Sequence, residues 1–129
     1  MSASVFQKAF NNHFDEFVAD LLSVFPNNKD ILTAQNALSL LRQGNPKILI
    51  NLWNKHIVSK YAEQIEAGDI KFFIDKDYNE DIQDNSSTIM VYIDKFRQPV
   101  SEMSQEDQEK CMTYFKNLTG LAKKYFQTK

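Results

Sequence analysis

The stretch FQKAFNNHFDEFVADLLSV, residues 6–24, decides the fold class because its apolar side chains recur at steps of three and four. This spacing places them on one face of an α-helix, as in helices that pack against a core. The residues on that face are Phe6, Phe10, Phe14, Phe17, Leu21 and Val24. The pattern predicts a helix over residues 4–25, which ends before Pro26 because proline disfavours the α conformation in the residue preceding it.

Two more helices are predicted from the turn residues around them. A turn at Asn27–Asn28 leads into a second helix, which Gly44 is expected to end as its C′ residue. Asn45 is expected to cap a third helix that has Pro46 as its first residue. The third helix is expected to continue, straight or kinked, to Gly68. The inner face of the second helix is expected to consist of Ile31, Ala34, Leu38 and Leu41. That of the third helix is expected to consist of Leu49, Leu52, Trp53, His56, Ile57 and Tyr61.

In the second half of the chain, Asp69 is expected to cap a short segment. Residues 70–74 fit a helix better than a strand because their spacing is three and four, although a strand is the alternative. A further helix is expected from Asn85 or Ser86 to Pro99. Ser104 is expected to cap the last helix, in which Gly120 would allow close packing against a neighbour. The apolar face of this last helix is Cys111, Phe115, Leu118, Ala122 and Tyr125.

These patterns predict an all-α fold, a compact single-domain bundle of five to seven helices over residues 1–129. An acidic loop near residues 75–87 is expected to interrupt it. Only three Gly and three Pro provide turn material, which argues against a many-stranded β fold. The residues expected in the core are Phe14, Phe17, Leu38, Trp53, Phe96 and Phe115.

Composition indicates an intracellular protein that is not membrane-bound. Hydrophobic and charged fractions of 43% and 25% are those of soluble globular proteins. The single cysteine, Cys111, excludes an internal disulfide and fits a reducing compartment. No basic and apolar leader opens the chain, and the longest apolar run, Ile89–Ile93, is far short of the roughly 20 residues that span a bilayer.

The acidic loop partly resembles a Ca²⁺-binding loop. Asp75, Asp77, Asn79 and Asp81 occupy the alternate positions 1, 3, 5 and 7 of that pattern, where oxygen ligands are needed. Position 6 is Glu80 in place of glycine, and position 12 is Ser86 in place of a bidentate glutamate. We therefore expect a solvated loop, with weak cation binding as the alternative and no high-affinity metal site.

Catalytic chemistry is not expected. Cys111 as nucleophile with His13 or His56 as base is the candidate catalytic pair. Such a pair works by holding a thiolate beside an imidazole. Cys111 falls on the apolar face of its helix, where an inert core thiol is usual. No pair formed from the cysteine and the two histidines has the spacing of zinc ligands. The sequence thus predicts no enzyme, no catalytic or metal-binding residue and no cofactor.

The last helix carries a possible basic contact face made of Lys116, Lys123 and Lys124, with aromatic residues nearby. Lysines neutralise phosphates and aromatic rings stack on bases, so this end could bind nucleic acid. The alternative is a helix C-terminus whose positive charges are favourable to the helix dipole. The net charge of −2 favours this second interpretation, and nucleic acid is not expected as a partner.

Three stretches together resemble a group of small uncharacterised proteins of large double-stranded DNA viruses of algae and protists. They are Val24-Phe-Pro-Asn-Asn-Lys-Asp-Ile31, Asn45-Pro-Lys-Ile48 and Ile65-Glu-Ala-Gly-Asp-Ile-Lys-Phe-Phe-Ile-Asp-Lys-Asp-Tyr78. The resemblance covers most of the chain and ends with the Asn117-Leu118 and Tyr125 pattern. It implies a viral protein in the host cytoplasm, a viral factory or the virion. Its motifs are not catalytic signatures, so it assigns no site residue.

The sequence therefore favours a non-enzymatic structural or protein-interaction protein, with virion association as one form of that role. It would bind an unidentified protein partner through an aromatic-rich helical surface. The alternative is a nucleic-acid-associated accessory protein that uses the basic C-terminal helix. The sequence leaves the oligomeric state open.

Overall fold

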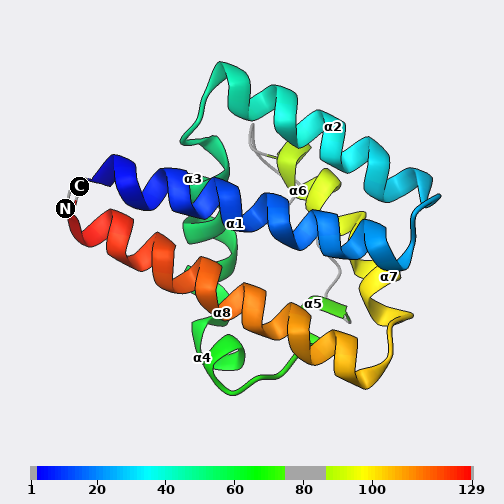
Figure 1. Ribbon diagram of the computed structural model, residues 1–129. Coiled ribbons are helices and arrows are strands. Elements are labelled where there is room, and N and C mark those ends of the chain that lie inside the picture. Colours follow the sequence, from blue (N-terminus) through cyan, green and yellow to red (C-terminus); the bar gives the residue numbers. More distant parts are fainter. Residues whose placement is uncertain (1–2, 75–86, 129) are drawn as a thin grey trace.

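The computed structural model describes residues 3–74 and 87–128, and within these ranges it contains helices and no strand, which confirms the all-α prediction. The elements, in chain order, are α1 (Ala3–Val24), α2 (Lys29–Gly44), α3 (Ile48–Trp53), the π-helical turn η1 (Asn54–Val58), α4 (Ser59–Glu66), α5 (Lys71–Ile74), α6 (Ser87–Asp94), α7 (Arg97–Ser101) and α8 (Gln105–Thr128) (Figure 1).

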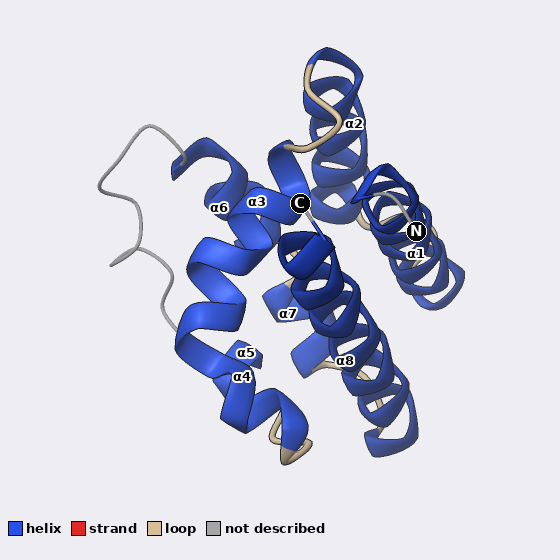
Figure 2. Cartoon of the chain, turned by 90° about the vertical axis from the view of Figure 1, so that its left-hand side faces the viewer, coloured by secondary structure: helices blue, strands red, loops and turns tan. Residues whose placement is uncertain are grey.

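The helices form two layers. One layer consists of α2, α1 and α8 side by side, with α1 in the middle and antiparallel to α8, so that the described ends of the chain meet at one end of the molecule (Figure 1). The second layer consists of α3 to α7, and Figure 2 shows most of it to the left of α1, α2 and α8. The core lies between the layers, where the inner face of α1 packs against α2, α3 and α8.

The core is rich in aromatic side chains, as the stripe on α1 predicts. All six residues expected there are at most 2% exposed. Phe17 is surrounded by three rings, with its centroid 5.9 Å from that of Phe96, just before α7, and 5.7 Å and 5.3 Å from those of Tyr114 and Phe115 on α8. Val24, the last residue of the predicted stripe and of α1, is 42% exposed and does not belong to the core.

Several predicted helix ends are confirmed by their hydrogen bonds. The Ile31 N–H donates to Asn28 Oδ1 at the start of α2 (3.0 Å), and the Asp107 N–H donates to Ser104 Oγ at the start of α8 (3.2 Å). Gly68 ends α4 with a positive φ of 75°. Its conformation lets the Asp69 N–H donate back to the Gln64 carbonyl (2.9 Å), as in a Schellman motif. Residues 71–74 are helical, so the helix favoured for this segment is the conformation observed.

The turn between α2 and α3 differs from the prediction. Gly44 is the last helical residue of α2 and not a left-handed C′ residue, because the next N–H, that of Asn45, still donates to the Leu41 carbonyl (3.0 Å). Helix α3 begins at Ile48 and not at Pro46. The Pro46 carbonyl instead accepts hydrogen bonds from Gln7 (3.1 Å) and Asn11 (3.0 Å) of α1, which holds this turn against the first helix.

The sequence predicted that Pro99 ends the helix before it, and this prediction is wrong. Helix α6 already ends at Asp94, and Pro99 is buried in the first turn of α7. An N–H in the first turn of a helix has no partner within the helix, so proline is tolerated there. The predicted third helix does continue to the Gly68 region. It is interrupted by η1 and by a non-helical Tyr61 (φ −128°, ψ 15°), which supply the kink.

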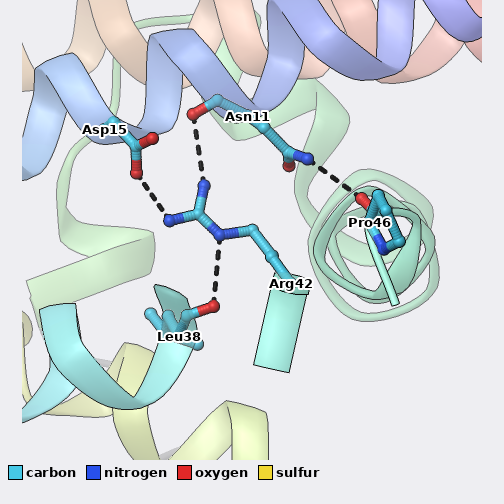
Figure 3. A network of polar contacts seen from close by, with 5 residues as sticks. All are labelled: Asn11, Asp15, Leu38, Arg42 and Pro46. Atoms are coloured by element: carbon cyan, nitrogen blue, oxygen red, sulfur yellow. Dashed lines mark hydrogen bonds and ion pairs between the residues drawn. The ribbon is translucent and has the colours of Figure 1, made fainter. Parts of the chain in front are cut away.

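Arg42 of α2 forms hydrogen bonds to α1 that were not predicted from the sequence (Figure 3). Its guanidinium donates to the Leu38 carbonyl (3.2 Å), to the Asn11 carbonyl (3.2 Å) and to Asp15 Oδ1 (2.5 Å). It also lies 5.7 Å from the centroid of the Phe14 ring. The side chain is only 11% exposed, so its charge is largely shielded from water and depends on these partners.

We expect Phe17→Ala to lower the free energy of unfolding by about 3–5 kcal/mol, because it leaves a cavity among rings that cannot all collapse into it. Urea denaturation measures this change. The control is Val5→Ala on the same helix, at a side chain that is 44% exposed. It should change stability by no more than about 0.5 kcal/mol. A Phe17→Ala effect as small as the control would mean that the ring does not belong to the core.

We expect Arg42→Met to lower the free energy of unfolding by about 1.5–3 kcal/mol, because it keeps the apolar stem and removes charge-assisted hydrogen bonds to α1. Asp15→Asn should reduce it by less than about 1 kcal/mol, because Asp15 is 58% exposed and its ion pair is screened by water. Equal losses for the two variants in urea denaturation would show that the contact to Asp15, and not the backbone contacts, ties α2 to α1.

Candidate functional site

A groove runs along the outer side of the contact between α1 and α8, and we name it the outer groove. It has a volume of about 590 Å³. Small and apolar residues, Ala9, Gly120 and Leu121, form part of its lining. The remaining lining residues are polar or charged: Asn12, His13, Glu16, Lys116, Asn117 and Lys124.

The outer groove continues along the same two helices toward the far end of the molecule. A second hollow of about 310 Å³ shares His13, Glu16 and Asn117 with it. That hollow in turn shares Asp20 and Tyr114 with a cavity of about 150 Å³ near the end of α1. The three hollows are therefore neighbours along one line, and α1 and α8 supply almost all of their lining.

The outer groove and the hollow of about 310 Å³ beside it carry charges of both signs, and in these two hollows α1 and α8 contribute different signs. Acidic side chains, Glu16 and Asp20, come from α1, whereas most of the basic ones come from α8. His13 lies between them: its Nδ1 is 3.4 Å from Glu16 Oε2, and its ring lies 4.8 Å from that of Tyr114. A ligand that fits this line would therefore need to match both signs of charge.

Gly120 lies in the outer groove and not at a packed helix contact, which corrects the expectation that it allows a neighbouring helix to approach. A Cβ atom built on Gly120 would meet nothing within 4 Å. The residue is in the interior of α8, where glycine lowers helix stability by about 1 kcal/mol relative to alanine. Packing among the described residues gives no reason for this glycine.

The three lysines of the predicted basic face do not share one direction. Lys116 and Lys124 both line the outer groove, together with the acidic Glu16. Lys123 is directed toward α4, where its Nζ lies 3.5 Å from Glu66 Oε1. The described surface around these lysines is therefore one of mixed charge.

Cys111 is only 4% exposed, and its thiol lies 3.6 Å from the sulfur of Met103. Burial raises the pKa of Cys111 to about 12, and the nearby carboxylates of Asp107 and Asp20 contribute to the same shift. The thiol is therefore protonated at neutral pH and is a poor nucleophile. His56 is 4% exposed in η1, and His13 lies in the outer groove.

The candidate cation loop of Asp75, Asp77, Asn79 and Asp81 lies outside the described residues. Within residues 3–74 and 87–128, no group of three histidine, cysteine, aspartate or glutamate side chains is arranged to hold a metal ion. In the same ranges, no helix is long and apolar enough to span a bilayer.

The groove was not identified from the sequence, although one signal was present. On α1 the residues Ala9, Asn12, His13, Glu16 and Asp20 also recur at steps of three and four, on the face that flanks the aromatic stripe. Such a polar stripe ordinarily faces water, and only the pairing of α1 with α8 turns it into the wall of a groove. No family model, curated protein or solved structure matches this chain.

Proposed function

We propose that this chain is a non-enzymatic protein-interaction domain that binds a partner protein along the outer groove. The observation that carries the proposal is Gly120. Its missing side chain leaves open space at the surface of α8, and no contact inside the described structure uses that space. A glycine that lowers helix stability without serving internal packing is explained if another chain approaches the helix backbone there.

The lining of the outer groove supports a protein as the partner. Ala9, Gly120 and Leu121 offer a small apolar strip, and charged residues border it. An apolar centre with a polar rim is the usual composition of a protein interface. An amphipathic helix lying between α1 and α8 would bury its apolar side on the strip and meet Glu16 on one flank and Lys124 on the other.

The aromatic residues that suggested a binding surface are mostly unavailable for it. Phe10, Phe14, Phe17 and Phe115 are at most 2% exposed and belong to the core. We therefore assign binding to the outer groove, with the half-buried Tyr114 at its continuation toward the end of α1. The viral setting implied by the sequence resemblance is part of the proposal, and in that setting the partner would be another virion or viral-factory protein.

An enzymatic role is not proposed, since Cys111, the nucleophile considered from the sequence, is buried and protonated. The proposal therefore rests on the outer groove and not on a reactive thiol.

Affinity capture from nuclease-treated extracts of expressing cells tests the proposal with three forms of the chain. Gly120→Leu fills the outer groove. Gly44→Ala is the matched control, because a Cβ at Gly44 also meets nothing within 4 Å but lies at the end of α2, outside the groove. The original chain and Gly44→Ala should capture the same partner, and Gly120→Leu should lose it. Identical capture by all three forms, or capture abolished by nuclease, would contradict the proposal.

We expect Gly120→Ala to raise the free energy of unfolding by about 0.5–1 kcal/mol, because alanine favours the helix and has room for its methyl group. The same substitution should weaken partner capture, because the methyl group occupies the groove. Thermal or urea denaturation measures the first effect, and titration of the captured partner measures the second. A loss of stability would show that Gly120 has a packing role in the fold.

We expect no appreciable binding to single- or double-stranded DNA or RNA at about 0.15 M salt. The reason is that Glu16 and Glu66 lie among the lysines and oppose a phosphate backbone. Fluorescence anisotropy with labelled oligonucleotides checks this. A submicromolar dissociation constant that weakens steeply with salt, and is lost when Lys116, Lys123 and Lys124 are all replaced by Gln, would favour the nucleic-acid function instead.

A further inference from the structure

The cavity of about 150 Å³ between the end of α1 and the start of α8 has the properties of a small-molecule site, and we name it the end cavity. Its apolar wall includes Phe17, Leu21 and Cys111, which are at most 4% exposed, together with the thioether of Met103. A space of this volume is large enough for a benzene ring. This part of the lining is therefore preformed, apolar and large enough for a compact hydrocarbon body.

Two carboxylates, Asp20 and Asp107, line the same cavity from opposite helices. Asp20 is oriented by the Tyr114 hydroxyl, which donates a hydrogen bond to Asp20 Oδ2. Among the described residues of the lining, the one basic side chain is that of Lys110, which is 68% exposed and has its Nζ 3.9 Å from Asp107 Oδ1. An ion pair this exposed and this long is weak, so Lys110 neutralises the two carboxylates poorly.

Burial, with a smaller contribution from the two carboxylates, raises the pKa of two weaker acids in the same lining. The pKa of Tyr114 is raised to about 12, by burial first and then by Asp20. The pKa of Cys111 is also raised to about 12, by burial first and then by Asp107 and Asp20. Both groups are neutral near pH 7, so the charged side chains among the described lining residues are those of Asp20, Asp107 and Lys110. The end cavity therefore combines an apolar wall with a net negative charge.

We propose that the end cavity binds a small organic cation, a primary ammonium carried on a compact apolar body such as one aromatic ring. The body would lie against Phe17 and Leu21. The ammonium, with its three N–H donors, would be shared between Asp20 and Asp107. This site goes beyond the proposed protein interaction, because it takes a small molecule and requires no partner protein.

Titration of the full chain with three probes of similar shape tests the proposal. The probes are benzylammonium, neutral benzyl alcohol and anionic benzoate, each followed by the amide signals in two-dimensional NMR. Benzylammonium should bind with shifts concentrated at residues 17–24 and 103–114. Benzyl alcohol should bind at least about fivefold more weakly, since it lacks the charge, and benzoate should give no saturable shift. This comparison needs no variant and does not depend on the protein-interaction proposal.

Substitution of the carboxylates gives the second test. Asp20→Asn and Asp107→Asn keep the size of the side chain and should each weaken benzylammonium binding about three- to tenfold, with little effect on benzyl alcohol. Glu106→Gln is the matched control, because it removes a carboxylate next to Asp107 that does not line the cavity. It should leave binding unchanged. Thermal denaturation shows whether each variant folds.

Three results would overturn the proposal. The first is equal binding of benzylammonium and benzyl alcohol, which would mean that the carboxylates contribute nothing. The second is a loss of affinity as large for Glu106→Gln as for the two aspartate variants, which would mean that general electrostatic attraction is responsible. The third is no saturable benzylammonium binding, or shifts that map outside the end cavity.

Discussion

The packing of α1 against α8 is the constraint on which the rest of the structure depends. These helices come from opposite ends of the chain, and their contact is built around Phe17 and Phe115, whose ring centroids are 5.3 Å apart. Buried aromatic rings remove a large apolar area from water, so this contact is strong enough to bring distant segments together. Once α1 and α8 are paired, α2 and the second layer have a fixed surface on which to pack.

Polar contacts then select one arrangement among those that the apolar core would allow. Trp53 Nε1 donates to Thr119 Oγ1 (3.2 Å) in the interior, and Arg42 donates to the backbone of both α1 and α2. A buried donor without an acceptor is costly, so a shifted register would be penalised at both places. The apolar residues thus provide most of the stability, and a few buried donors determine how the helices are aligned.

The same α1–α8 contact produces both candidate sites. On its outer side, two polar helix faces leave the outer groove, where Gly120 keeps α8 open at a cost to helix stability. Near the end of α1, the helices leave the end cavity, with a buried apolar wall and two carboxylates. We propose a protein ligand for the groove and a small cation for the cavity. The two differ because the outer groove is larger and of mixed charge, whereas the end cavity is smaller and combines a partly apolar wall with two carboxylates.

The sequence by itself determined the all-α fold and most of the inner faces, because helix periodicity, the turn at Asn28, the cap Ser104 and the stop at Gly68 act over a few residues. Only the tertiary structure decided the role of residues whose partners are distant in the chain. Arg42 depends on Asn11 and Asp15 of another helix, and the turn before α3 depends on α1 side chains that bind the Pro46 carbonyl. The position of Gly120 in the outer groove and the placement of Asp20 and Asp107 in one cavity likewise follow from the pairing of α1 with α8, which no local pattern contains.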